Sequence, residues 1–311
     1  MARKIPKIVR EIRANPPQEI NFAYQKNISY SQMQIFRQCP HRWKLQYKDK
    51  IKRFTSSIHT VFGTAIHEVL QHYLDVMFDT SAVNADKLDL ENLFQEKFIG
   101  EYQNQYKKNK DQHFSTAEEM REFFEDGVGI LSWFRKKRAK YFSRRGWHLV
   151  GCEVPIKVTP HKYKPNLLLQ GYLDIVMYHE PSQTFKIIDI KTSKSGWNKT
   201  MKSDENKQLQ LVLYKKYFSE LYNVPVEKIE VEFFIVKRKL YESKEFVIRR
   251  IQVFTPPSGK VKMNRVTKSL NNFINEVFGQ DEYLDKDYQP TPHKNCHWCP
   301  FNKTHLCSAT Y

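Results

Sequence analysis

The sequence predicts an α/β protein whose elements follow the order helix, strand, hairpin, helix, strand. Three observations support this. Apolar residues recur at helical spacing in some segments and in short strand-like runs in others. The stretch from Gly171 to Ser193 has two such runs separated by a turn signal, Pro181-Ser182. The chain of 311 residues, 40% of them hydrophobic, is long enough to bury a large core.

The net charge of +17, from 51 Lys and Arg residues against 34 Asp and Glu, is the compositional outlier. Such an excess suggests a polyanionic partner, usually nucleic acid; solubility or a lysine-rich genome bias is the alternative. No apolar run approaches the roughly 20 residues of a membrane span, and the basic N-terminus lacks the apolar core of a signal peptide. We therefore expect a cytoplasmic protein, in the host cytoplasm if a phage encodes it, with no membrane partner.

The first part of the chain is predicted to be mainly helical. Residues 1–28 are expected to form a basic arm with weak structure. Pro40 suits the first turn of a helix but breaks its interior, so Cys39 should lie at a junction between two helices. A strong helical pattern then runs from Val61 to Phe78, with His67 in its first turns.

A helical insertion over about 79–145 ends in a run that mixes basic and aromatic residues. This mixture suits phosphate-backbone contacts combined with base stacking. The alternative is an amphipathic helix with aromatics in the core and charges in water, which explains the aromatics but not so much charge of one sign. The residues assigned to DNA binding are Arg135, Lys136, Lys137 and Arg138, and a second basic run of Lys237, Arg238 and Lys239.

Strands dominate after residue 145. The first is predicted from His148 to Val158, and Glu153 within it lies either on the solvent face or toward a site. After the hairpin, a polar loop leads to a helix in which Gln210 and Tyr214, four residues apart, share one face. The remaining predicted elements are two strands and a basic helix, at 228–240, 245–254 and 260–278.

The hairpin brings two acids into register. If its turn is centred on Pro181-Ser182, Asp174 lies directly opposite Asp189, and opposed Cβ atoms are about 4.5–5.5 Å apart. Like charges in this arrangement destabilise a sheet unless a cation sits between them. Lys191 emerges on the same face as Asp189, because side chains alternate along a strand. Two carboxylates and a lysine around one point indicate a metal-dependent hydrolytic centre.

This order of elements resembles the PD-(D/E)XK nuclease superfamily, and more narrowly its RecB-like branch, which includes the CRISPR-associated exonucleases. Four motifs carry the resemblance: a helix with a histidine after a glycine (GTAIHEVL), a Gly-x-x-Asp strand (GYLD), an Asp/Glu-x-Lys strand (IDIKTS) and a Gln-x-x-x-Tyr helix (QLVLY). The resemblance covers about residues 29–307. It implies a restriction-endonuclease-like core with a mixed central sheet flanked by helices and added helical segments, and a single nuclease domain over 29–311.

The resemblance also implies a role for each matching residue. Lys191 would orient or activate the attacking water, and Gln210 and Tyr214 would support the site or touch DNA. The metal would be Mg²⁺ or Mn²⁺, since hard oxygen ligands and open water positions suit these cations. Its ligands would be His67, Asp174, Asp189 and the main-chain carbonyl of Ile190, with Glu153 as a weaker candidate.

Cysteines extend the resemblance. In the RecB-like branch, one early Cys, often followed by Pro, and three late Cys hold a [4Fe–4S] cluster that joins the two ends of the chain. Here this implies that Cys39 joins a C-terminal segment, 293–311. The cluster ligands would be Cys39, Cys296, Cys299 and Cys307. The alternative is a Zn²⁺ site made by Cys296, Cys299, His305 and Cys307. Cys152 is left over as a buried strand residue.

We therefore expect a metal-dependent DNA nuclease, foremost an exonuclease acting on DNA ends or single strands in recombination, repair or phage DNA processing. A structure-specific endonuclease on the same core is one alternative. A catalytically silent nucleic-acid-binding protein with a zinc site is another. The expected partner is DNA, as single strands or duplex ends. No G-x-x-x-x-G-K-[ST] motif occurs, so any motor would be a separate helicase or recombination partner.

Overall fold

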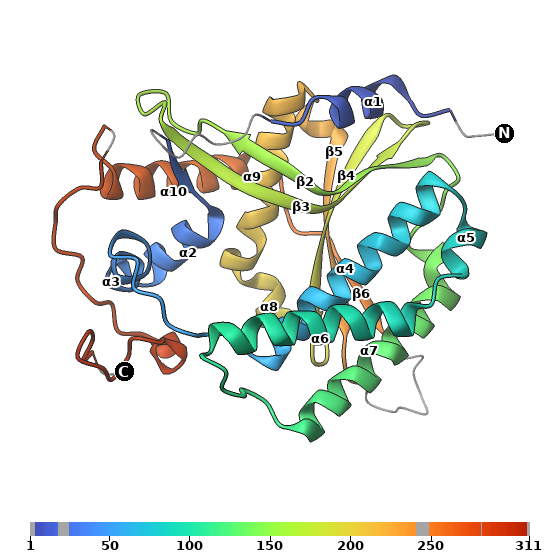
Figure 1. Cartoon of the computed structure of the whole chain (residues 1–311). Coiled ribbons are helices and arrows are strands. Elements are labelled where there is room, and N and C mark those ends of the chain that lie inside the picture. The colour runs from blue at the N-terminus through green and yellow to red at the C-terminus, as the bar shows by residue number, and fades with distance from the viewer. Residues whose placement is uncertain (1–3, 18–24, 241–248, 281, 310–311) are drawn as a thin grey trace.

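The computed structural model describes residues 4–17, 25–240, 249–280 and 282–309, and a mixed sheet of six strands lies at its centre (Figure 1). Strand β3 organises this sheet. It pairs with β2 along most of its length, with β1 at its first three residues and with β4 at its last five. Strand β5 is parallel to β4, and β6 is antiparallel to β5. The strands are β1 (Lys26–Ile28), β2 (Trp147–Val158), β3 (Leu167–His179), β4 (Thr184–Ser193), β5 (Ile229–Lys237) and β6 (Ile251–Phe254).

The β3–β4 hairpin has the predicted register. Its paired residues are placed symmetrically about Pro181-Ser182, and the last pair away from the turn is Ile175 with Ile188. Pairing stops there, so Asp174 and Asp189 are the first residues beyond the ladder. Both acids therefore lie where the two strands separate.

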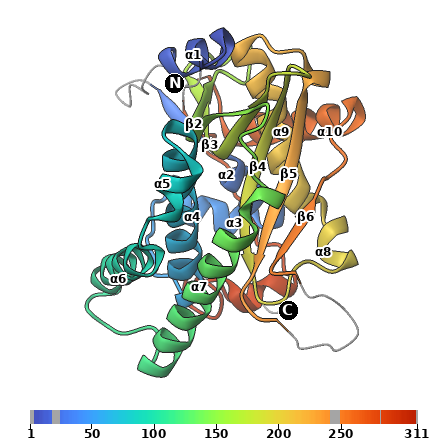
Figure 2. The same ribbon diagram turned by 90° about the vertical axis from the view of Figure 1, so that its right-hand side faces the viewer.

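Helices cover both faces of the sheet (Figure 2). On one face, α9 and α10 pack with α2 and α3 around Trp43 and Phe273; on the other, α4 packs with α6 and α7 around Phe62 and Phe134. This confirms the predicted α/β architecture, in which helices flank a mixed sheet. The helices are α1 (Lys7–Ala14), α2 (Tyr30–Gln38), α3 (Pro40–Trp43), α4 (Ile58–Asp79), α5 (Ala82–Asp86), α6 (Leu90–Lys108), α7 (Ala117–Lys137), α8 (Lys199–Ser203), α9 (Glu205–Tyr222) and α10 (Lys260–Val277).

Four shorter helical turns complete the described chain: η1 (Lys44–Lys48), η2 (Arg138–Lys140), η3 (Val226–Lys228) and η4 (Lys294–Trp298). The region 79–145 is mostly helical, as predicted, and Cys39 lies at the junction between α2 and α3. None of the helices in the described ranges is long and apolar enough to cross a membrane.

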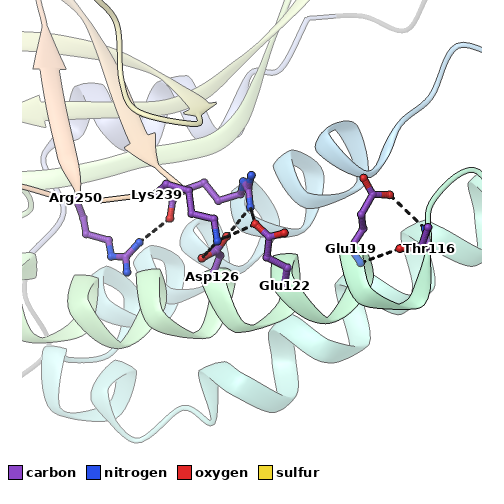
Figure 3. Close-up of polar contacts among 7 residues, drawn as sticks. Thr116, Glu119, Glu122, Asp126, Lys239 and Arg250 are labelled. Carbon is purple, nitrogen blue, oxygen red and sulfur yellow. Dashed lines mark hydrogen bonds and ion pairs between the residues drawn. The ribbon is translucent and has the colours of Figure 1, made fainter. Parts of the chain in front are cut away.

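Helix α7 is tied to the end of β5 by a network of ion pairs (Figure 3). The Arg238 guanidinium lies 2.8 Å from a Glu122 carboxylate oxygen and 2.6 Å from one of Asp126. Lys239 lies 2.8 and 2.9 Å from the same two carboxylates. Arg250 donates to the main-chain carbonyl of Arg238 at 2.8 Å. These contacts hold the helical insertion against the strand next to β4.

The expected weak structure of residues 1–28 is corrected by two elements, α1 and β1. Apolar residues in KIVREIRA recur three and four apart, which gives a helix with one apolar face. Its Val9 and Ile12 are buried, and Arg13 donates to the main-chain carbonyls of Leu149 and Val150 in β2, at 2.9 and 3.0 Å. The segment 7–14 therefore packs on the sheet.

Three boundaries also differ from the prediction. Helix α4 begins at Ile58, so His67 lies near its middle. The predicted polar loop after the hairpin contains α8, which is capped by the Asn198 side chain accepting from the Met201 N–H at 2.9 Å. Strand β6 is shorter than the predicted strand over 245–254, and residues 245–248 lie outside the described ranges.

Candidate active site

Asp174 marks the point where β3 and β4 separate. Its carboxylate oxygen Oδ2 accepts a hydrogen bond from the main-chain N–H of Ile190 at 2.7 Å. A side chain thus takes the place of a main-chain acceptor where the ladder ends. This contact fixes Asp174 beside the strand that carries Asp189.

Lys191 is paired with Asp189. The Nζ atom lies 2.6 Å from Oδ2 of Asp189, whose side chain is 5% exposed, whereas that of Lys191 is 35% exposed. The carboxylate of Asp189 is therefore buried, whereas the Lys191 side chain is partly exposed. The ion pair places one positive charge beside a buried acid.

His67 reaches the acids from α4. Its Nδ1 atom lies 3.7 Å from Oδ2 of Asp174. Gly63, one turn earlier on the same helix, allows the helix to approach β4 closely, because a Cβ there would lie 3.2 Å from Oγ1 of Thr192. The Gly-x-x-x-His spacing thus has a steric reason.

Gln71 connects this helix to two strands, and the sequence analysis did not single it out. Its Nε2 atom donates to Oε1 of Glu153 at 2.6 Å and to the main-chain carbonyl of Asp174 at 3.0 Å. Its position four residues after His67 puts both side chains on one helix face, and this spacing is the signal that could have found it.

Glu153 lies in register with Asp174 across β2 and β3, because the flanking pairs are Cys152 with Ile175 and Val154 with Leu173. It is exposed, with a backbone φ of 49°. A positive φ is uncommon for a residue with a side chain. The local irregularity turns Glu153 toward Gln71, at the rim of the site.

Tyr214 is buried on α9, and Gln210 donates to its hydroxyl oxygen at 3.3 Å. Burial, with a further contribution from Asp189, raises the pKa of Tyr214. The predicted Gln-x-x-x-Tyr pair therefore lies together on α9, with the Tyr214 ring against Gly171 of β3.

Burial and neighbouring charges shift the pKa values of the site residues. Burial, followed by the neighbouring Asp189, raises the pKa of Asp174 to about 7. Burial also raises the pKa of Asp189 in spite of Lys191. Burial alone would lower the pKa of Lys191, but the two acids outweigh it and raise that pKa. Burial and then Lys191 lower the pKa of His67 to about 4, so its imidazole is neutral at pH 7.

These residues fit a divalent cation. Suitable ligands for Mg²⁺ or Mn²⁺ include carboxylates, main-chain carbonyls and neutral imidazoles. The site has two carboxylates that resist ionising together, one such carbonyl and one such imidazole. Within the part of the chain that the structure describes, no three His, Cys, Asp or Glu side chains are close enough to hold a metal ion as they stand. The metal ligands therefore stay a prediction.

The first predicted DNA-binding run is partly engaged within the protein. Arg138 forms an ion pair with Asp86 at 2.7 Å, and Arg135 lies near the main-chain carbonyls of Asp86 and Leu88. The neighbouring aromatics Phe134 and Phe142 are buried in the core, as the alternative interpretation held. Lys136 and Lys137 are exposed and free of any ion pair to the described residues.

The second run serves the α7 network. Arg238 is buried between Glu122 and Asp126, and Lys239 contacts the same acids. Lys237 has its side chain packed against Gly196. DNA binding by this run stays a prediction, and Arg238 could reach a phosphate only by leaving two carboxylates.

Four of the five cysteines line one cavity between the α2–α3 junction and the C-terminal segment. His41 beside them contacts the main-chain carbonyls of Tyr288 and Leu306 at 3.0 and 2.9 Å, which joins the early helix to the late segment. His305, which the zinc alternative needs, is not among the residues that line this cavity. The four lining cysteines are Cys39, Cys296, Cys299 and Cys307.

The fold and the geometry at the hairpin together define an α/β protein in which two carboxylates and a lysine gather where the central strands β3 and β4 separate. A model of the PD-(D/E)XK nuclease superfamily matches residues 27–304, and the chain belongs to that superfamily. Membership implies nuclease activity on a nucleic acid, and PD-(D/E)XK nucleases generally use Mg²⁺ or Mn²⁺. No curated protein matches the chain.

Proposed function

We propose that the protein is a metal-dependent DNA nuclease, foremost an exonuclease acting on DNA ends or single strands. The observation that carries the proposal is the position of Asp174 and Asp189 at the separating end of the hairpin, with Lys191 beside them. The net charge of +17 supports a nucleic-acid substrate. A role in recombination, repair or phage DNA processing rests on the resemblance to the RecB-like branch.

Each residue has a task that its position supports. Asp174, Asp189, the carbonyl of Ile190 and His67 would hold the metal. When bound, the metal would lower the pKa of water and offset charge on the phosphate. Lys191 has a partly exposed side chain beside Asp189, and its ammonium group would orient the attacking water and stabilise negative charge that develops on the phosphate.

Gln71 and Tyr214 would act through other residues of the site and not on the substrate itself. Gln71 donates to the main-chain carbonyl of Asp174, and Tyr214 is buried against Gly171 of the strand that carries Asp174. We assign both as positioning residues, and we keep Gln210 as the partner of Tyr214.

Cleavage of end-labelled single- and double-stranded DNA with Mg²⁺ or Mn²⁺ tests the proposal. The variant Asp189→Asn keeps the side-chain shape and should lose cleavage while its circular dichroism spectrum stays that of the wild type. Full activity in this variant would sink the assignment. Covalently closed circles separate the alternatives, because an exonuclease leaves them intact and a structure-specific endonuclease opens them.

We also propose that the four cavity-lining cysteines bind a [4Fe–4S] cluster. Four thiolates are the usual ligands of such a cluster, and the convergence of one early and three late cysteines on one cavity supports it. The cluster would then close residues 29–311 into one nuclease domain by joining Cys39 to the segment 293–311. Iron and zinc analysis after anaerobic purification distinguishes the cluster from the zinc alternative.

A further inference from the structure

A second, larger groove lies away from the acids. It runs between the segment before α4, the C-terminal end of α6 and the residues after η4, and it encloses about 860 Å³. Figure 1 shows the end of α6 next to the C-terminal segment on this side of the molecule. Its charged lining residues are all basic: Lys52, Arg53, Lys108 and Lys110.

These cations are available to a ligand. All four are exposed, and none forms an ion pair with a residue in the described ranges. Arg53 has its guanidinium carbon 5.9 Å from the ring centre of Phe301, which holds it at the groove. Four unneutralised positive charges and no carboxylate in the lining select a polyanion.

The remaining lining chemistry suits bases and sugars. Tyr47 and Phe54 line the groove with half-buried aromatic rings that also pack on Trp43 and Phe114, and base stacking on aromatics is a common feature of single-strand binding. Gln46 and Ser56 each carry a buried polar atom with no hydrogen-bond partner among the described residues. The volume falls in the range of pockets for single small ligands, so it accepts a short single strand rather than a duplex.

The groove and the candidate active site share helix α4. Thr60 lines the groove, and His67 follows seven residues later on the same helix. At 1.5 Å per residue this is about 10 Å, a distance that a few nucleotides of a single strand can span. A strand held in the groove can therefore place its next phosphates at the two acids.

We propose that this groove binds single-stranded nucleic acid and directs it to Asp174 and Asp189. Delivery of the strand to the two acids rests on the proposed nuclease function, whereas binding in the groove needs no catalysis.

The test is the binding of fluorescent oligo-dT to the full-length protein in EDTA, where no cleavage occurs. The charge-reversal pair Lys52→Glu with Lys108→Glu removes two lining cations. The matched control is Lys87→Glu with Lys107→Glu, which makes the same change in net charge at exposed lysines of the same helical region outside the groove.

We expect the groove pair to weaken binding at least tenfold and to reduce the salt-dependence slope by about 2 relative to the wild type. The control pair should change affinity less than threefold. Equal weakening in both pairs, or wild-type affinity in the groove pair, would overturn the inference. The inference would also be overturned if the wild type bound duplex more tightly than single strand and the groove pair removed that preference. Loss of cleavage in Asp189→Asn bears on the nuclease proposal alone, so the two failures are distinguishable.

Discussion

Tyr214 lies directly against the backbone of Gly171. A Cβ atom added at Gly171 would lie 2.6 Å from the hydroxyl oxygen and 2.7 Å from the Cζ atom of the Tyr214 ring. Three residues later, β3 carries Asp174. Only a glycine leaves room for the tyrosine here, so the Gly-x-x-Asp motif and the Gln-x-x-x-Tyr motif form one packed unit.

The first prediction follows from this contact. The variant Gly171→Ala forces the buried Tyr214 ring to move, and overpacking of this kind costs about 1–3 kcal/mol. We expect a lower free energy of unfolding in urea and weaker cleavage, because β3 carries the displaced acid. Adding Tyr214→Ala should recover part of the lost stability, and a strictly additive double variant would contradict the contact.

The second prediction separates Lys191 from the acids. Lys191→Met removes the ammonium group but leaves both carboxylates, so Mn²⁺ binding measured by calorimetry should persist. Cleavage should fall about 100-fold or more, as for other lost electrostatic stabilisers. Asp189→Asn should lose both binding and cleavage. Loss of Mn²⁺ binding in Lys191→Met would show that the lysine supports the metal site instead.

The hairpin was predictable because its information is local. The turn residues fix the register, and the register places Asp174 and Asp189 at matching positions on the two strands. The side-chain period of two then puts Lys191 near Asp189, and the 2.6 Å ion pair agrees with that.

Contacts between distant segments were not predictable in this way. Gln71 reaches a strand 82 residues away, and Arg238 meets acids 112 and 116 residues before it. A basic run in the sequence indicates charge but not its partners, so the pairing of Arg238 and Lys239 with two acids of α7 could not be read from it. The helix at 7–14 differs from the prediction of weak structure for a related reason. Its basic residues dominate the segment, and the apolar face that packs on the sheet is narrow.

The third prediction concerns metal and stability. The neighbouring Asp189 raises the pKa of Asp174, so ionising both acids is unfavourable without a cation. A divalent cation that binds only the folded state stabilises the folded protein. At 100 times its Kd this amounts to about 2.7 kcal/mol, or a rise of roughly 4 °C in Tm for a chain of 311 residues. Mg²⁺ should produce this rise in the wild type and not in Asp174→Asn. An equal rise in both would place the cation elsewhere.

The fourth prediction is a pH dependence of the α7 network. Hydrogen bonds from Lys239 and Arg238 lower the pKa of Glu122 to about 2. Since the folded pKa lies below the ordinary value of about 4.3, the contribution to stability is complete above that value and disappears as the pH falls toward 2. The Tm difference between the wild type and Glu122→Gln should therefore shrink from pH 6 to pH 2.5.

A suitable control for this measurement is Glu118→Gln, one turn earlier on α7. Glu118 is exposed and makes no ion pair with the described residues. Its Tm difference from the wild type should be small at every pH. A pH trend as large as that of Glu122→Gln would assign the effect to the overall charge of α7 and not to the network.

The fifth prediction uses the fifth cysteine as an internal control. Cys39 lines the shared cavity from the α2–α3 junction, whereas Cys152 lies in β2 with its thiol 3.8 Å from the main-chain carbonyl of Gln71. Burial strongly raises the pKa of the Cys152 thiol, so it resists becoming a thiolate ligand. The test replaces Cys39 and Cys152 by serine in separate variants. Iron content and visible absorbance are then measured after anaerobic purification.

Cys39→Ser should lose most of the iron and its absorbance, and its C-terminal segment should become susceptible to limited proteolysis, because the cluster joins residues more than 250 positions apart in sequence. Cys152→Ser should keep the iron content and the proteolysis pattern of the wild type. If Cys39→Ser retains a metal that proves to be zinc, the site is local to the C-terminal segment, and the contacts between the two chain ends include the hydrogen bonds of His41 but no shared cluster.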